Sequence, residues 1–210
     1  MQNPTLSNPE PKQKGYTIIE LGIALAIIAV LIVAGLAGVT TVLNSSKANA
    51  QIEDSGIVLA KLQSSLTSTN ASGITTATGV GSSFFPTSRV ANNVVTSKFG
   101  GNEFIASNAA ALTVATHGVD VAISVGAIYT ITAVPRAVCA DIANSLSNLA
   151  NSAWVYNATP TETTAGAATN LSVGATGSQI KAPGGVVNAV AVGRQCNLAE
   201  TVSLAFFLRP

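Results

Sequence analysis

The longest pattern along the chain is an uninterrupted apolar run near the N-terminus. Residues 21–43 hold no charged side chain, and 13 of these 23 residues are Leu, Ile or Val. As an α-helix at about 1.5 Å per residue, the run would reach about 34 Å, which matches the roughly 30 Å hydrocarbon core of a bilayer. It therefore predicts a helix that can cross a membrane.

Beyond residue 43 the apolar positions become one-sided. They recur at spacings of 7, 3 and 4, which is the period of an amphipathic helix: Ile52, Leu59, Leu62 and Leu66. No proline interrupts residues 15–85. One continuous helix is therefore predicted, ending near residues 68–73, where Ser, Thr, Asn and Gly cluster.

The rest of the chain is typical of strands and loops with one short helix. The clearest strand signal covers residues 121–134, where β-branched and aromatic residues alternate with small ones. Residues 135–151 then predict a helix with Val138, Ile142, Leu146 and Leu149 on one face. Further strands are expected at 154–157, 186–192 and 202–208, and a surface loop at 159–178. The pattern predicts an α+β fold, with a long helix against an antiparallel sheet.

Composition and charge exclude some partners. Charged residues make up 9% of the chain, against about 25% in an average soluble protein. Ten basic and nine acidic residues provide no basic field for nucleic acid, so no nucleic-acid partner is expected. Cys139 and Cys196 lie far apart and outside any CxxC spacing. A disulfide outside the cytoplasm is the simpler interpretation, and two buried free thiols are the alternative.

No catalytic motif is visible. His117 is the single histidine, and no Ser or Cys stands in a recognisable nucleophile motif with a partner base. The pairs Gly100-Gly101 and Gly184-Gly185 predict turns and do not fit a phosphate-binding loop. Acids such as Glu103 are scattered and form no calcium cluster. We expect no enzyme, metal or cofactor.

One carboxylate, Glu20, borders the apolar run, where an ionisable residue is presumed functional. Lys12 and Lys14 precede the run, so this flank should stay cytoplasmic and the rest should be exported. A secretory signal is one alternative, because Ala48-Asn49-Ala50 imitates a cleavage site, but signal cores are typically about 7 to 15 residues. A plain membrane anchor explains the length and leaves Glu20 unexplained.

The hexapeptide GYTIIE, residues 15–20, follows a short basic leader and precedes an apolar helix. It resembles the prepilin processing site of type IV pilins and related pseudopilins. The resemblance implies that a membrane prepilin peptidase cuts after Gly15 and methylates the new amine of Tyr16. It also implies that Glu20, at the family's fifth mature position, pairs with the Tyr16 amine during assembly. That amine belongs either to the same chain or to the next subunit, which is the family's usual arrangement. Helix capping by an acid in the first turn is the alternative.

A cysteine in a helix after the middle strands, a second near the C-terminus and the last strand TVSLAFFLRP resemble the class b pilins. A long leader and Tyr16 as first mature residue point the same way. The resemblance implies the pilin fold, with a disulfide between Cys139 and Cys196 bounding the C-terminal region 139–196. Its expected parts are a leader (1–15), a protruding apolar helix that forms the filament core (16–43), its amphipathic continuation (44–70) and a globular head (71–210).

The implied function is that of a structural subunit polymerised into a helical filament for adhesion, aggregation or conjugative mating contact. The implied partners are further copies of the chain, the prepilin peptidase, the pilus assembly machinery and a host or recipient cell surface. The subunit would wait in the bacterial inner membrane and then form an extracellular pilus. Two alternatives are a minor pilin or adhesin whose head binds a receptor through Trp154 and Tyr156, and a secretion-system pseudopilin.

Overall fold

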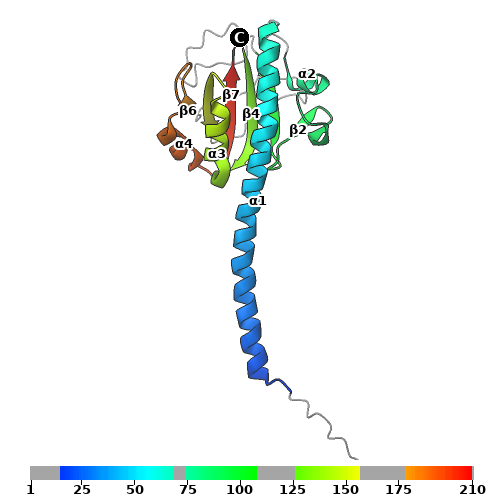
Figure 1. Cartoon of the computed structure of the whole chain (residues 1–210), viewed down its shortest axis with the longest axis vertical. Coiled ribbons are helices and arrows are strands. Elements are labelled where there is room, and N and C mark those ends of the chain that lie inside the picture. The colour runs from blue at the N-terminus through cyan, green and yellow to red at the C-terminus, as the bar shows by residue number, and fades with distance from the viewer. Residues whose placement is uncertain (1–14, 69–73, 108–125, 157–177, 210) are drawn as a thin grey trace, which may run out of the picture. The chain divides into compact units, whose positions relative to one another are not determined.

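The computed structural model describes residues 15–68, 74–107, 126–156 and 178–209. It forms two compact units, Met1–Val42 and Leu43–Pro210. Helix α1 (Ile18–Ser68) continues from the first unit into the second (Figure 1), so the predicted long N-terminal helix and its end near residue 68 are confirmed.

The first unit consists, in its described part, of the apolar portion of α1. Every large apolar side chain from Ile18 to Val42 is between 50% and 90% exposed. The helix is long and apolar enough to cross a membrane, judged by length and composition. Exposure of this much apolar surface is unfavourable in water, which requires lipid or other protein around this portion.

The second unit is built on a seven-stranded sheet in which all neighbours are antiparallel. In spatial order the strands are β1 (Val90–Ala91), β2 (Val94–Thr96), β3 (Asn102–Ser107), β4 (Ala127–Pro135), β7 (Thr201–Leu208), β5 (Ser152–Tyr156) and β6 (Ser178–Lys181). The predicted α+β class with an antiparallel sheet is therefore confirmed. The C-terminal strand β7 lies between β4 and β5, inside the sheet and away from both of its edges.

The described part of this unit also contains helices α2 (Thr76–Gly81), α3 (Arg136–Ser147) and α4 (Ala189–Cys196), and the short 3₁₀ helix η1 (Thr87–Arg89). The amphipathic C-terminal part of α1 packs into the core of this unit, as predicted. Leu59, Leu62 and Leu66 are at most 2% exposed, and Ile52 is partly buried. Figure 1 shows this part of α1 and α3 lying over the same face of the sheet. Tyr129 of β4 and Phe206 of β7 stand under them with ring centroids 6.4 Å apart.

Two sequence predictions for this unit are wrong. In the predicted strand at 186–192, Val187 forms only an isolated β-bridge with Lys181, and residues 189–192 are the start of helix α4. The side chain of Asn188 accepts a hydrogen bond from the backbone N–H of Ala191 at 3.0 Å and caps the helix there. Leu149 was expected on the buried face of α3 and is 54% exposed, because the helix ends at Ser147. Residues 121–125 of the predicted strand, most of the loop 159–178, and His117 lie outside the described residues.

Turns follow the residues that permit them. Asn92 and Asn93 both have positive φ, 52° and 62°, and connect β1 to β2 in a two-residue hairpin. Gly100 and Gly184 have φ of 85° and 70°, which places both predicted glycine pairs in turns.

Candidate functional site

The sequence-predicted processing residues lie at the start of α1. Gly15, Tyr16 and Thr17 have no helical structure, and all three are exposed, Tyr16 by 83%. The first residue of the helix is Ile18. The peptide bond between Gly15 and Tyr16 therefore stands two residues outside the helix, in backbone that another protein can reach.

Thr17 caps the helix. Its side-chain hydroxyl accepts a hydrogen bond from the backbone N–H of Glu20 at 3.3 Å, and its carbonyl accepts one from the N–H of Leu21 at 3.1 Å. The first four N–H groups of a helix have no partner within the helix, and an N-cap hydroxyl satisfies one of them. Thr17 and Glu20 have the spacing of a capping box, of which this contact is one half.

Glu20 thus occupies the first turn of α1, where a negative charge is stabilised by the positive end of the helix dipole. Its side chain is exposed, and no ion pair in the described part of the chain involves it. Before cleavage, residue 16 contributes only a peptide nitrogen. The capping interpretation is therefore compatible with the structure, and the pairing interpretation requires an amine that cleavage creates.

A second polar site lies inside the head and was not predicted. Glu103 of β3 is 0% exposed. It accepts hydrogen bonds from the phenol of Tyr129 at 2.6 Å and from the amide of Gln51 at 2.9 Å, and it pairs with Arg89. Ser55 of α1 contacts the same phenol at 2.9 Å. Since Tyr129 donates its proton to Glu103, Ser55 is the donor in that contact.

This polar cluster has balanced charge. Asp54 lies 3.4 Å from Arg89, without hydrogen-bond geometry, and 3.1 Å from the ammonium group of Lys98. The backbone N–H of Lys98 also donates to the side chain of Gln51 at 2.9 Å. Two cations and two anions thus tie α1 to η1, to the residues after β2 and to β3. Burial of charge is costly unless the charges are paired in this way.

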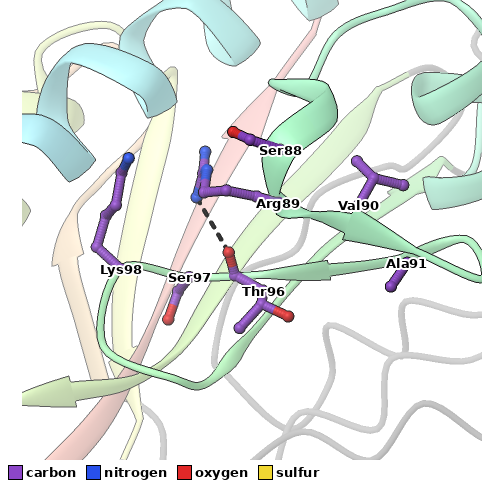
Figure 2. A pocket seen from close by; sticks show the side chains of 7 residues that line it. All are labelled: Ser88, Arg89, Val90, Ala91, Thr96, Ser97 and Lys98. Carbon is purple, nitrogen blue, oxygen red and sulfur yellow. Dashed lines mark hydrogen bonds between the residues drawn. The ribbon is translucent and has the colours of Figure 1, made fainter.

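Beside the cluster is an open pocket of about 360 Å³, whose lining Figure 2 shows: Ser88, Arg89, Val90, Ala91, Thr96, Ser97 and Lys98. Arg89 donates to the carbonyl of Thr96 at 3.3 Å across it. Both cations in the lining are already paired with the acids of the cluster. The pocket therefore offers no uncompensated charge to a ligand.

Burial raises the pKa of Tyr129 well above its ordinary value of 10.0, and the negative charge of Glu103 raises it further. In the unfolded chain the phenol ionises near pH 10, while the folded chain retains the proton to higher pH. Ionisation of this phenol therefore has no effect on stability below about pH 10, and it lowers stability as the pH rises above that value.

We expect this loss of folding stability at alkaline pH to be absent from the variant Tyr129→Phe. That variant should be less stable than the wild type at pH 9, because two buried hydrogen bonds are lost. The difference in free energy of unfolding between the two proteins should be smaller by about 1.4 kcal/mol at pH 11. Urea unfolding of both proteins at the two pH values measures this. Lysine titration is common to both proteins and cancels in the difference. A gap that stays constant would contradict the assignment.

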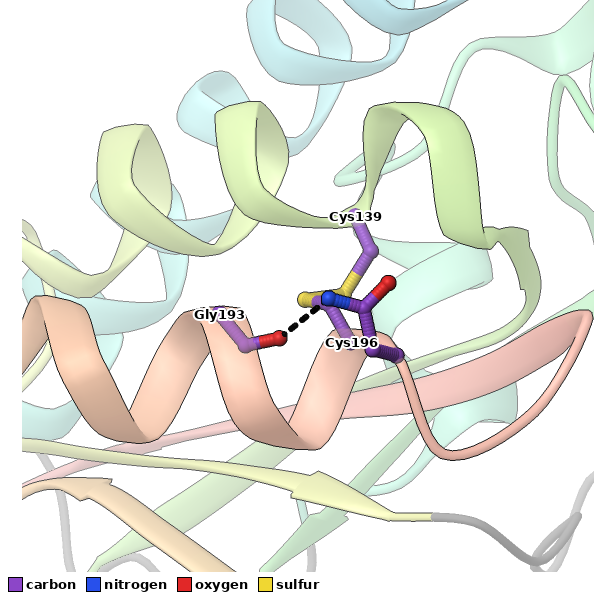
Figure 3. The surroundings of a disulfide bond; sticks show 4 residues. Cys139, Gly193 and Cys196 are labelled. Atoms are coloured by element: carbon purple, nitrogen blue, oxygen red, sulfur yellow. Dashed lines mark hydrogen bonds between the residues drawn. A yellow bond between two sulfur atoms is a disulfide. The ribbon is translucent and has the colours of Figure 1, made fainter.

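The disulfide expected from the resemblance is present. Cys139 of α3 and Cys196 at the end of α4 are bonded, with Cα atoms 5.7 Å apart and 57 residues of separation (Figure 3). Both residues are buried. The bond fixes α3 to α4, and Asn197 then closes α4 by donating to the carbonyl of Gly193 at 2.9 Å.

Trp154 does not fit a receptor-contact patch. It is 3% exposed on β5, and this burial corrects the expectation that its ring belongs to the surface. The backbone of Tyr156 ends the same strand, and its side chain lies outside the described residues. Among the residues that the structure describes, no group of His, Cys, Asp and Glu could hold a metal ion.

The Thr17 cap and the polar cluster around Glu103 were both unpredicted, but they differ in how clearly the sequence indicates them. The Thr17–Glu20 spacing is a capping signature that the sequence contains in full. The pairing of Arg89 with Glu103 bridges 14 residues and depends on a hairpin between them. No strand was predicted at 102–107, so no pattern in the sequence marked Glu103 as an inward-facing acid.

Residues 11–36 match the family model described as the prokaryotic N-terminal methylation motif. This stretch of the chain carries the N-methylation motif of prokaryotic prepilins. The prepilin motif contains Gly15, Tyr16, Thr17 and Glu20 together with most of the apolar segment.

Solved structures of two pilins are similar in backbone to this prepilin-like chain. The type IV b pilin from Salmonella typhi has 14% sequence identity and a TM-score of 0.49, over 77% of this chain and 99% of that one. TcpA, a type IV pilin from Vibrio cholerae El Tor biotype, has 14% identity and a TM-score of 0.45, over 77% and 98%. No curated protein sequence matches the chain.

Proposed function

We propose that this chain is a structural subunit of a type IVb pilus and not an enzyme. The prepilin peptidase cuts after Gly15 and methylates the amine of Tyr16. The apolar part of α1 then holds the subunit in the inner membrane until the assembly machinery moves it into a helical filament on the cell surface. In the filament Glu20 pairs with a Tyr16 amine.

The observation that carries the proposal is the arrangement at the start of α1. A methylation motif, an exposed peptide bond and a carboxylate without an ion pair among the described residues lie together at the start of a membrane-length apolar helix. A plain anchor needs only the last of these. A carboxylate at the edge of the apolar segment is compatible with a filament core if cleavage supplies its counter-charge.

The charge balance supports packing of many copies. Removal of the leader deletes Glu10, Lys12 and Lys14, which leaves eight basic and eight acidic side chains in the mature chain. Neighbouring subunits would then meet without net repulsion. The task of the filament is adhesion, aggregation or conjugative mating contact. Burial of Trp154 gives no support to a receptor site at that ring.

Gly15→Ala should leave a full-length precursor that accumulates in the membrane and does not enter filaments. The matched control is Gly22→Ala, since an added Cβ meets nothing within 4 Å at either position. Gly22→Ala should be cleaved like the wild type. Mass spectrometry of membrane and sheared-surface fractions gives the N-terminus in each case. An intact leader on subunits from surface filaments would overturn the proposal.

A further inference from the structure

The helix begins immediately after the bond that the proposed function requires to be cut. Because α1 starts at Ile18, its first backbone acceptor is the carbonyl of Thr17, which bonds the N–H of Leu21 at 3.1 Å. The carbonyls of Gly15 and Tyr16 come before that first acceptor. They are therefore not used by the helix.

Capping by Thr17 accounts for this starting point. Its hydroxyl takes the N–H of Glu20, which would otherwise be unsatisfied at the helix end. Tyrosine has no oxygen placed to cap in this way, so Tyr16 is a poor substitute. Glycine is nearly as acceptable as a hydroxyl residue at this position, and Gly15 is the next candidate toward the N-terminus.

Loss of the cap at Thr17 would therefore move the start of the helix to Tyr16. Gly15 would become the N-cap, and its carbonyl would become the first acceptor, taking the N–H of Ile19. Cleavage of the bond adds water to the Gly15 carbonyl carbon and breaks its bond to nitrogen, which leaves a carboxylate on Gly15 and an amine on Tyr16. A carbonyl that is bonded within a helix is poorly placed for that attack.

We propose that Thr17 is a positioning residue for processing. Its hydroxyl holds the Gly15–Tyr16 bond outside the helix, in exposed backbone. The same contact puts Glu20 at the third position of the first turn. This inference rests on the proposed function, because it assumes that the peptidase acts at this bond.

The test uses the full-length chain in lipid–detergent micelles with a prepilin peptidase, and it measures kcat/KM by mass spectrometry of the products. Thr17→Val keeps the branched shape and removes the capping oxygen, while Thr17→Ser and Thr17→Asn keep an oxygen. We expect Thr17→Val to lower kcat/KM about fivefold, the fold-change that corresponds to a typical N-cap contribution. Both capping variants should stay within about twofold of the wild type, since Ser and Asn cap as well as Thr.

Amide hydrogen exchange at Ile19 provides the readout specific to the mechanism. Its N–H precedes the first helical hydrogen bond in the wild type and becomes bonded if the helix extends to Gly15, so exchange should slow in Thr17→Val. Equal cleavage of Thr17→Val and wild type would overturn the inference and leave the proposed function intact. So would slow cleavage of all three variants, which would mean that the peptidase recognises threonine itself. Slow cleavage of Thr17→Val with unchanged exchange at Ile19 would also overturn it. Failure of the wild type to be cleaved would contradict the proposed function.

Discussion

Glu20→Ala is expected to insert in the membrane and be cleaved normally, and to form at least tenfold fewer filaments than the wild type. Insertion should persist because removing a charge from the edge of an apolar segment favours the membrane. Assembly should fail because an amine and a carboxylate at about 4 Å, with an effective dielectric constant near 20, attract by roughly 4 kcal/mol. Electron microscopy and immunoblotting of sheared surface fractions measure the yield.

Two further variants separate pairing from capping. Glu53→Ala removes another exposed acid from α1, beyond the apolar segment, and should assemble normally. Glu20→Gln keeps the size of the side chain and the backbone N–H that Thr17 caps, and it removes only the charge. A loss in Glu20→Gln comparable with that in Glu20→Ala would assign the defect to the charge. Normal piliation of Glu20→Ala would rule out the pairing role.

Arg89→Met is expected to lower the free energy of unfolding of the head by about 3 to 5 kcal/mol. Glu103 is fully buried, and Arg89 supplies its positive partner. Removing one member of a buried ion pair leaves the other as an uncompensated charge, which is the costly case. Urea unfolding followed by the fluorescence of Trp154, the single tryptophan, measures the change with the disulfide kept oxidised.

The matched control is Arg136→Met, which breaks the exposed pair with Glu200. The charged atoms of Arg136 and Glu200 lie 2.9 Å apart, and their side chains are 46% and 84% exposed. The expected change in the free energy of unfolding is therefore below about 1 kcal/mol. Adding Glu103→Gln to Arg89→Met should recover much of the loss, because the buried charge is then gone. If Arg89→Met and Arg136→Met unfold at the same urea concentration, the cluster does not stabilise the head as described.

If the cluster behaves in this way, it explains how a helix with a long apolar portion is held in one register on the head. Apolar side chains such as Leu59 and Leu62 pack without direction. The hydrogen bonds of Gln51 with Glu103 and of Ser55 with Tyr129 are directional and must be satisfied together, and Asp54 adds a charge beside Arg89. A slip of α1 by one turn would leave several buried polar groups unpaired.

The features that the sequence determined by itself are local or periodic. The apolar run, the amphipathic stripe through Leu66 and the processing motif around Gly15 each depend on residues within a few turns of one another. Helix α1 accordingly appears where it was predicted and ends at Ser68. The prediction of a strand at 186–192 was wrong because a valine-rich run is compatible with either a strand or a helix. The cap at Asn188 and the packing of α4 beside Cys139 decided for helix.

Tertiary packing determines which distant residues meet. The spacing of Arg89 and Glu103 carries no sign that they pair, because the meeting depends on the Asn92-Asn93 turn and on the register of β2 with β3. The same holds for Trp154, whose aromatic ring suggested a contact surface and whose strand position buries it beside strand β7. Sequence periodicity reports which face of an element is apolar. It does not report what lies opposite that face, and burial and ion pairing are both properties of the opposing surface.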